Sequence, residues 1–174
     1  GVDHRRNRED EDFFHLAKNK GNLNSYYQFP LSNDSSMALQ RHFNKFMDGN
    51  YDQSEKIIIN NRPFPFIAKA GGVIWTDFNN LCNEYRSQID YLLLCRKFHT
   101  ILVSDVPQLS SEQNSAARRF TWLVDILYDQ KIRLIISAQV APDHLYITGM
   151  FADEFKRTVS RIMEMQSETV FDNN

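Results

Sequence analysis

Apolar residues recur at helical spacing in three stretches of the chain. The first stretch has one apolar face, formed by Leu39, Phe43, Phe46 and Met47. Residues 34–36 (Asp-Ser-Ser) precede it and offer helix caps, and Gly49 follows it as a stop. Residues 111–129 and 153–166 repeat the pattern, the last with Phe155, Val159, Ile162 and Gln166 on one face. We therefore expect an amphipathic helix in each stretch.

Short apolar runs between these helices indicate strands. Residues 56–59 form a β-branched run, and residues 64–68 and 73–75 flank a Lys-Ala-Gly-Gly tetrapeptide as two strands flank a hairpin turn. Thr76 and Ser87 then look like N-caps of two further helices. Ser87 has Asp90 three residues later, in the manner of a capping box.

The order of elements in the second half predicts the fold class. Residues 99–106 and 131–138 are near-continuous apolar runs, joined by the helix expected over residues 111–129. This is a βαβ pattern, and such runs suit parallel strands covered on both faces. We expect an α/β fold in which the parallel βαβ unit supports a C-terminal helix. The chain divides into residues 1–54, a charged segment with an amphipathic helix, and the α/β part, residues 55–174.

Composition limits the class of protein. The 20 Lys and Arg residues nearly balance the 22 Asp and Glu residues, so we expect no nucleic-acid partner. No apolar run approaches the roughly 18 residues that a membrane-spanning helix needs. Cys82 and Cys95 lie in no metal or redox motif, and we expect both to be free thiols in a reducing compartment. The five histidines show no ligand spacing, so no metal site is expected.

Short strings lie in a fixed order from residue 75 to near the end of the chain. They are Trp75-Thr76-Asp77-Phe78, Leu81-Cys82, Asp90-Tyr91, Phe98-His99-Thr100, Ser104-Asp105-Val106-Pro107-Gln108-Leu109, Ala117-Arg118-Arg119-Phe120, Leu123-Val124-Asp125, Tyr128-Asp129, Ser137-Ala138, Glu154-Phe155-Lys156-Arg157-Thr158, Ser160-Arg161 and Glu164-Met165-Gln166. Together they resemble the C-terminal half of the ZapE-like (AFG-one-like) ATPases of the AAA+ superclass. Asp3-His4-Arg5 is also similar to the family's Asp-Tyr-Arg segment, with histidine in place of tyrosine.

The resemblance implies a P-loop-NTPase-like fold and, in the full-length protein, ATP hydrolysis with ATP and Mg as cofactors. It implies remodelling of a protein partner or substrate by a homo-oligomer. In bacteria the family is linked to cell division and the inner membrane, which suggests a cytoplasmic protein with peripheral membrane association; the alternative is mitochondrial protein quality control. The family's nucleotide machinery lies in its N-terminal half, and the chain begins at Gly1 rather than methionine. We therefore expect part of a longer protein.

The chain has no GxxxxGK[ST] loop that could hold a nucleotide phosphate, so we expect it to be inactive alone and to bind no cofactor. Residues 101–105 look like a Walker B strand, which makes Asp105 a candidate magnesium ligand. Val106 stands where the family's glutamate would be. Ser137, at the end of the next strand, is a candidate sensor residue. The alternative for both residues is a purely structural strand end.

Four arginines inside the matching strings are candidates to stabilise phosphate charge, because arginines of a neighbouring element or subunit complete AAA+ sites. They are Arg118, Arg119, Arg157 and Arg161. The alternative is surface pairing, since Arg157 is four residues from Asp153 and Arg161 is three from Glu164. Arg119 falls inside the apolar arc of its helix and needs an anionic or carbonyl partner, whereas Arg118 points to the opposite side.

Two functions of different classes remain open from the sequence. In the first, this half serves ATP-driven remodelling through oligomer contacts, substrate engagement or arginines that act on a neighbour's nucleotide. In the second, it is a non-catalytic module that binds a protein partner and no nucleotide. Only the first makes the arginines matter to turnover.

Overall fold

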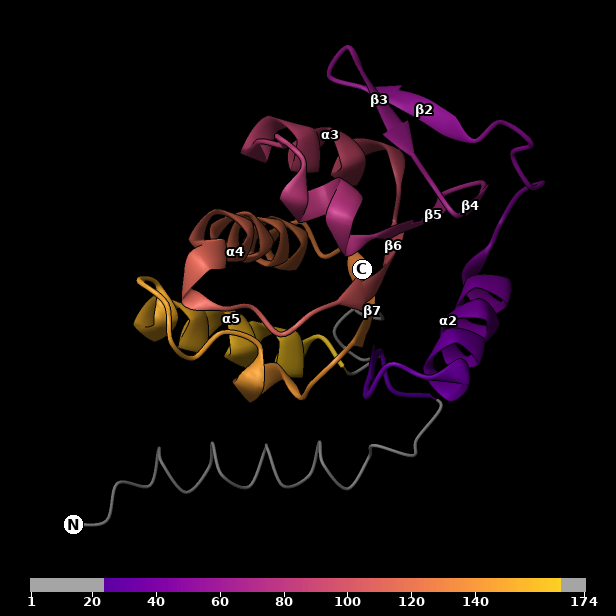
Figure 1. The fold of residues 1–174 in the computed structure, drawn as a ribbon. Coiled ribbons are helices and arrows are strands. Elements are labelled where there is room, and N and C mark those ends of the chain that lie inside the picture. Colours follow the sequence, from indigo (N-terminus) through magenta and orange to yellow (C-terminus); the bar gives the residue numbers. More distant parts are fainter. Residues whose placement is uncertain (1–23, 167–174) are drawn as a thin grey trace.

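A five-stranded sheet of order β1-β7-β6-β5-β4 lies at the centre of the computed structural model, which describes residues 24–166 (Figure 1). The strands are β1 (Tyr27–Gln28), β4 (Ala68–Ala70), β5 (Val73–Asp77), β6 (Thr100–Val106) and β7 (Arg133–Ala138). β1, β7, β6 and β5 run parallel, and β4 pairs antiparallel with β5. The α/β class predicted from the sequence is confirmed. The Asp3-His4-Arg5 string lies outside the described residues.

The predicted βαβ unit consists of β6, α4 (Asn114–Asp129) and β7. The two strands pair in parallel, with Thr100 opposite Arg133 and Val103 opposite Ile136. A 3-10 turn, η3 (Ser111–Gln113), precedes α4. Nearly every residue of both strands is buried. This burial explains the continuous apolar runs, because a parallel sheet is covered on both faces.

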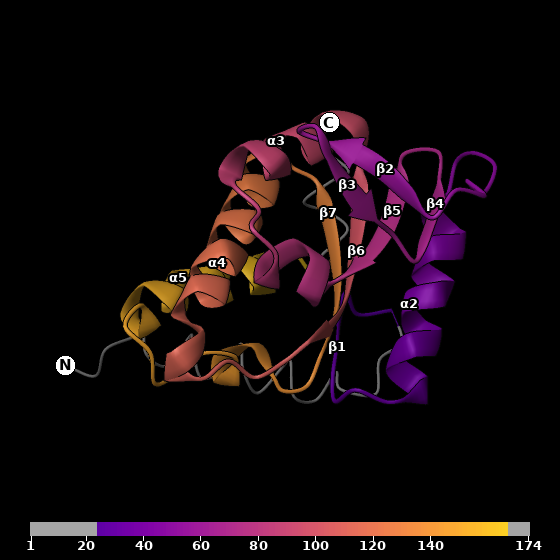
Figure 2. The same cartoon turned by 45° about the horizontal axis from the view of Figure 1, so that its top comes forward.

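Helices cover both faces of the sheet (Figures 1 and 2). α3 (Gln88–Lys97), α4 and α5 (Ala152–Glu164) lie on one face, and α2 (Asn33–Phe46) lies on the other. Leu39 and Phe43 of α2 pack with Trp75 and Leu102 in a small core of their own. β1 and α2 both precede residue 54, the boundary drawn from the sequence, and both contact strands that follow it.

The start and stop of α2 differ from the sequence-based expectation. Ser32, not residues 34–36, is the N-cap: its hydroxyl accepts from the backbone N–H of Ser35, and the Ser35 hydroxyl accepts from that of Ser32. The helix ends at Phe46, before Gly49. Gly49 instead permits a close approach, since a Cβ there would lie 2.9 Å from the Gly71 backbone.

The predicted hairpin exists with narrower bounds. β4 and β5 are joined by Gly71 and Gly72, and Gly71 has a φ of 62°, which favours glycine. Phe64 belongs instead to β3 (Arg62–Pro65), which pairs with β2 (Lys56–Ile59) in a separate two-stranded sheet.

The two helix starts predicted after this hairpin have different outcomes. Thr76 is not an N-cap: it is buried in β5, and its hydroxyl donates to the Pro65 carbonyl at 3.2 Å. The helix expected there is a single π-helical turn, η2 (Asn79–Asn83). The Ser87 capping box ahead of α3 is confirmed.

Candidate functional site

Asp105 and Ser137 meet at the carboxyl edge of the parallel strands. The backbone N–H of Asp105 donates to Ser137 Oγ at 3.1 Å. Asp105 has a φ of 63° and lies in a bulge between Val103 and Val106 of β6. Left-handed backbone is costly outside glycine but best tolerated by Asn and Asp. The bulge leaves Asp105 exposed and Ser137 buried, so the two meet through the Asp105 backbone and not through its carboxylate.

No metal centre accompanies this edge among residues 24–166, where no three His, Cys, Asp or Glu side chains are grouped to hold an ion. Each strand end nevertheless carries a polar residue. Asp77 ends β5 opposite Ser104 of β6, and its Oδ1 accepts from the backbone N–H of Asn80 at 2.8 Å. The Ser104 hydroxyl donates to the Thr76 carbonyl at 3.4 Å. The hydroxyls of this edge are thus occupied in holding the strands together.

Arg157 and Arg161 of α5 both face Asp125 of α4. Arg161 Nη1 donates to Asp125 Oδ1, and Arg157 Nη2 lies 3.9 Å from Asp125 Oδ2. The ion pairs that spacing within α5 predicts for these two arginines are wrong. Asp153 pairs with Lys156 instead, and Glu164 accepts from the Tyr128 hydroxyl. The two arginines therefore join α5 to α4.

Tyr128 completes this helix contact. Its ring lies 4.8 Å from the Arg161 guanidinium, and its hydroxyl donates to Glu164 Oε2 at 2.5 Å. This hydrogen bond to a carboxylate raises the pKa of Tyr128 above its usual value. The cluster is a structural link between α4 and α5, with its charges paired.

Arg118 and Arg119 occupy different environments, as predicted. Arg119 is half-buried; its Nη1 donates to the Cys82 carbonyl at 3.1 Å and its guanidinium lies 5.7 Å from the Tyr85 ring. Arg118 is exposed and lies over the rings of Trp122 and Phe151, at 5.2 and 5.4 Å. Within the described part of the chain Arg118 forms no ion pair. Of the four candidates it is the one with an exposed, unneutralised head.

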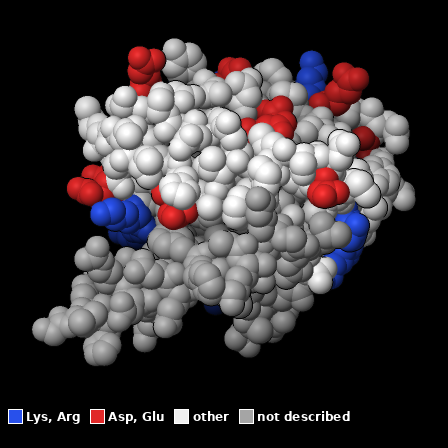
Figure 3. Space-filling view, turned by 60° about the horizontal axis from the view of Figure 1, so that its bottom comes forward, with Lys and Arg blue, Asp and Glu red and all other residues white. Residues whose placement is uncertain are grey.

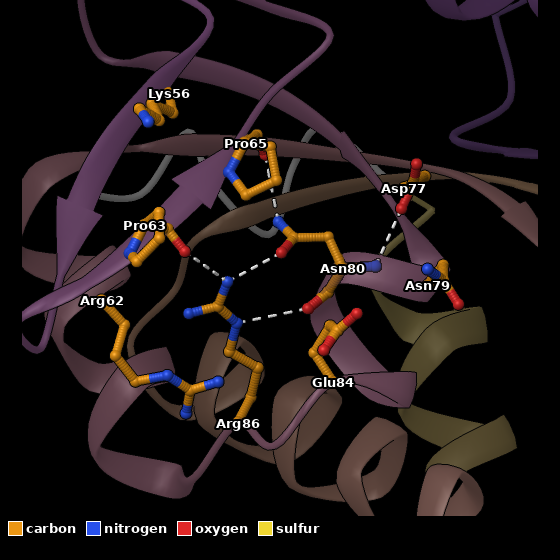
Figure 4. A pocket seen from close by; sticks show the side chains of 9 residues that line it. All are labelled: Lys56, Arg62, Pro63, Pro65, Asp77, Asn79, Asn80, Glu84 and Arg86. Carbon is orange, nitrogen blue, oxygen red and sulfur yellow. Dashed lines mark hydrogen bonds between the residues drawn. The ribbon is translucent and has the colours of Figure 1, made fainter.

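A pocket of about 510 Å³ opens between the β2–β3 pair and η2, and no candidate named from the sequence lines it (Figure 4). Its walls are Lys56, Arg62, Pro63, Pro65, Asp77, Asn79, Asn80, Glu84 and Arg86. Three of these side chains are cationic and two are anionic. The sequence gives no sign of it, because its walls are separate elements whose packing against each other has no local sequence signal.

Arg86 holds the two walls together. Its Nε donates to the Asn80 carbonyl at 3.2 Å, and its Nη2 donates to the Pro63 carbonyl at 3.0 Å and to Asn80 Oδ1 at 2.7 Å (Figure 4). The guanidinium also lies 4.9 Å from the ring of Phe64. Burial, and then the nearby charge of Arg62, lower the pKa of Arg86, yet arginine remains charged at neutral pH.

On the face that Figure 3 presents, acidic and basic side chains are interspersed and do not form a field of one sign. In the part of the chain that the structure describes, no helix has the length and apolarity of a membrane span.

Comparison with known proteins gives one matching family and several relatives. The family model for the AFG1-like ATPases matches residues 14–174. Cell division protein ZapE of Escherichia coli (strain K12) is 34% identical over 139 residues, which are 80% of this chain and 37% of that protein. No solved structure gives a significant match.

Two eukaryotic proteins are also similar. Lactation elevated protein 1 homolog B of Danio rerio is 28% identical over 176 residues, covering 82% of this chain and 35% of that protein. An uncharacterized protein of Schizosaccharomyces pombe is 40% identical over 80 residues, 46% of this chain and 18% of that protein. The chain thus spans little more than a third of the length of ZapE and of the Danio rerio protein. By its sequence match and its α/β fold, the chain belongs to the AFG1-like ATPase family.

Proposed function

We propose that this chain is the C-terminal portion of an AAA+-type ATPase that hydrolyses ATP, with Mg, to remodel a protein partner. The match to the AFG1-like ATPase family over residues 14–174 carries the proposal. Because the sequence contains no phosphate-binding loop, the nucleotide would be held by a part of the protein outside this chain. The 174-residue chain alone should show no micromolar binding of Mg-ATP in calorimetry. Micromolar binding of Mg-ATP to this chain would contradict the proposal that the nucleotide is held elsewhere in the protein.

Arg118 is the arginine of this chain that we assign to the nucleotide of a neighbouring subunit. The heads of Arg119, Arg157 and Arg161 already have a carbonyl or a carboxylate as partner. Arg118 is exposed on α4, and its contacts with Trp122 and Phe151 restrict its orientation without neutralising its charge. A charged group that is exposed yet restricted suits an arginine that stabilises phosphate charge in trans. We assign Asp105 and Ser137 to the structure of the sheet edge, because the hydrogen bond between them holds two of its strands together.

The test is the ATPase rate of the full-length protein, with Arg118→Ala compared with Arg96→Ala. Arg96 is likewise exposed, but on α3. Arginines that act on the transferred phosphate in trans are worth about 10³-fold or more in turnover, so Arg118→Ala should lose most activity and Arg96→Ala little. Mixing Arg118→Ala subunits with subunits defective in the phosphate loop should restore part of the rate. A wild-type rate in Arg118→Ala rejects the assignment; an inactive wild-type enzyme rejects the ATPase function.

The cellular setting follows from the relatives as a proposal. One relative is named a cell division protein of a bacterium. We place this protein in the bacterial cytoplasm, as a homo-oligomer that acts on a protein partner at the division site, with peripheral contact to the inner membrane; a mitochondrial setting in protein quality control is the alternative. Fluorescence microscopy of the tagged full-length protein in dividing cells distinguishes a septal from a diffuse position.

The rival function, a non-catalytic interaction module, has one observation in its favour. Large apolar side chains are exposed on and beside α3, namely Tyr85 at 81%, Ile89 at 59% and Leu92 at 40%, and Ile58 of β2 is exposed at 56%. Exposed apolar groups of this size are typical of protein-binding surfaces. If the chain is a non-catalytic interaction module, the protein binds its partner equally well with and without nucleotide, and Arg118→Ala leaves that binding unchanged.

A further inference from the structure

Arg86 has one hydrogen-bond donor without an acceptor. The residue is 5% exposed, and its Nε and Nη2 donate to oxygens of Asn80 and Pro63. Its Nη1 is buried and has no hydrogen-bond partner in the described part of the chain. In Figure 4 this nitrogen lies on the side of Pro63 and Arg62, away from Asn80. A buried charged donor left unpaired is costly, so the site favours an acceptor that reaches it.

Arg62 is a second cation in the same pocket. It begins β3, is half-buried, and donates through Nη1 to the Tyr85 carbonyl. Its charge acts on Arg86 strongly enough to be, after burial, the main cause of that residue's lowered pKa. Neither guanidinium forms an ion pair with a carboxylate among residues 24–166. Asp90 and Glu84 oppose part of this effect on the pKa of Arg86, but in the described structure neither of the two like charges has a paired anion.

We propose that Arg62 and Arg86 form a binding site for a phosphate group, which enters the pocket between β3 and η2 and accepts hydrogen bonds from Arg86 Nη1 and from the Arg62 guanidinium. Lys56 of β2, which lines the same pocket, adds to the positive potential. On binding, the Arg62 head turns from the Tyr85 carbonyl toward the anion.

A phosphate fits these donors better than a carboxylate does. Arg86 has only Nη1 free, so it cannot offer the two parallel donors that hold a carboxylate bidentately. A tetrahedral oxyanion with several acceptor oxygens takes single donors from separate cations and carries more charge. Asp77 and Glu84 line the same pocket and repel any anion, but the three cations Lys56, Arg62 and Arg86 outnumber them.

Two kinds of ligand carry such a phosphate group, the free phosphate ion and a small phosphate monoester. A pocket of about 510 Å³ exceeds the needs of the free ion and lies in the range usual for small-molecule sites. The inference is independent of the ATPase function proposed above, which rests on the family match. Absence of phosphate binding would leave that function standing.

Calorimetric titration of the 174-residue chain at fixed ionic strength tests the site, with inorganic phosphate, glycerol 3-phosphate and acetate as separate titrants. We expect both phosphates to bind and acetate not to bind. Tighter binding of glycerol 3-phosphate identifies a monoester as the ligand, and equal or weaker binding identifies the free ion. Acetate binding as tight as phosphate, or no heat with either phosphate, overturns the proposal.

Variants locate the binding in the pocket. Arg62→Gln keeps a polar side chain at a half-buried position and should weaken phosphate binding at least tenfold, whereas Arg96→Gln on the exposed surface of α3 should not. Arg86→Lys keeps the charge but loses the clamp on Asn80, so circular dichroism must first establish that it folds. Arg62→Gln with wild-type phosphate affinity overturns the site even if Arg86 variants do not fold.

Discussion

Nη1 of Arg119 donates a hydrogen bond to the backbone carbonyl of Cys82 at 3.1 Å, and this contact fastens α4 to η2. The two residues are far apart in sequence, so the bond closes part of the tertiary fold rather than a local turn. The acceptor is a neutral carbonyl. Losing the arginine would therefore leave a carbonyl without this donor but no unpaired buried carboxylate, which makes the cost smaller than that of breaking a buried ion pair.

Arg119→Ala should accordingly lower the free energy of unfolding by about 1.5 kcal/mol, the value of a hydrogen bond to a charged group. Arg118→Ala should lower it by less than about 0.5 kcal/mol, as is usual for an exposed surface residue. Urea unfolding of both variants, followed by tryptophan fluorescence, measures the difference. Equal losses in the two variants would mean that the Cys82 contact contributes nothing.

Asp125 is the acceptor shared by Arg157 and Arg161, and the structure ranks the two pairs. The Arg161 side chain is 19% exposed and donates directly to Asp125, while the Arg157 side chain is 70% exposed and lies 3.9 Å away. Exposed ion pairs contribute little. We expect Arg161→Ala to destabilise the fold by about 1 kcal/mol and Arg157→Ala by less than about 0.3 kcal/mol.

A double-mutant cycle isolates the Arg161 pair. The change caused by Arg161→Ala should shrink by at least half when Asp125 is already alanine, because the two residues contact each other. Full additivity of the two substitutions would show that they act separately. Arg157→Ala gives the matched comparison on the same helix and toward the same carboxylate.

Cys82 and Cys95 are free thiols in the structure, as expected from the sequence. Burial raises the pKa of Cys82 far above its usual range and raises that of Cys95 to about 11. Because the thiolate is the reactive form, both should react slowly with a thiol reagent at pH 8 while the protein is folded, Cys82 more slowly. In urea without reductant two thiols per chain should titrate at once. One or none would indicate a disulfide.

The parallel strands were the part of the fold most open to sequence reasoning. Residues 101–103 and 134–136 are apolar without alternation, as a strand buried on both faces needs, and the helix between them shows a clear apolar face. Helix ends were less certain. Thr76 has the chemistry of an N-cap, but the sheet buries it in β5 as a partner of Val103, and tertiary pairing overrides the local preference.

The candidate site was harder to predict from the sequence than the fold. Spacing suggested that Arg157 and Arg161 pair within their own helix, but Asp125 on α4 competes for both, and the docking of two helices has no local sequence signal. The hydrogen bonds of Arg86 could not be predicted from the sequence for the same reason. Its acceptors belong to β3 and η2, and a lone arginine ahead of an N-cap looks like surface charge until those elements are in place.

Asp48, just after α2, contacts the β4–β5 turn through one carboxylate oxygen and His99, the residue before β6, through the other. Gly72 donates its backbone N–H to Oδ1 at 2.7 Å, and His99 Nε2 lies 2.8 Å from Oδ2. The bond from Gly72, and then that from His99, lower the pKa of Asp48. A carboxyl whose pKa is lower in the folded state binds protons more readily when the chain is unfolded.

The stabilisation by Asp48 should therefore be fully present above about pH 4, the pKa of an unperturbed aspartate, and be lost as the pH falls through the lowered folded-state pKa. Asp48→Asn should remove that component, so the urea midpoint of the variant should fall less steeply than that of the wild type between about pH 4 and pH 2. Asp153→Asn is the control, because that side chain is fully exposed on α5 and pairs only with Lys156 in the described structure. If Asp48→Asn and the wild type keep parallel midpoint curves over this range, the two hydrogen bonds do not hold the charged carboxylate in solution, and the link between α2 and the hairpin depends on the packing of Gly49 against Gly71 instead.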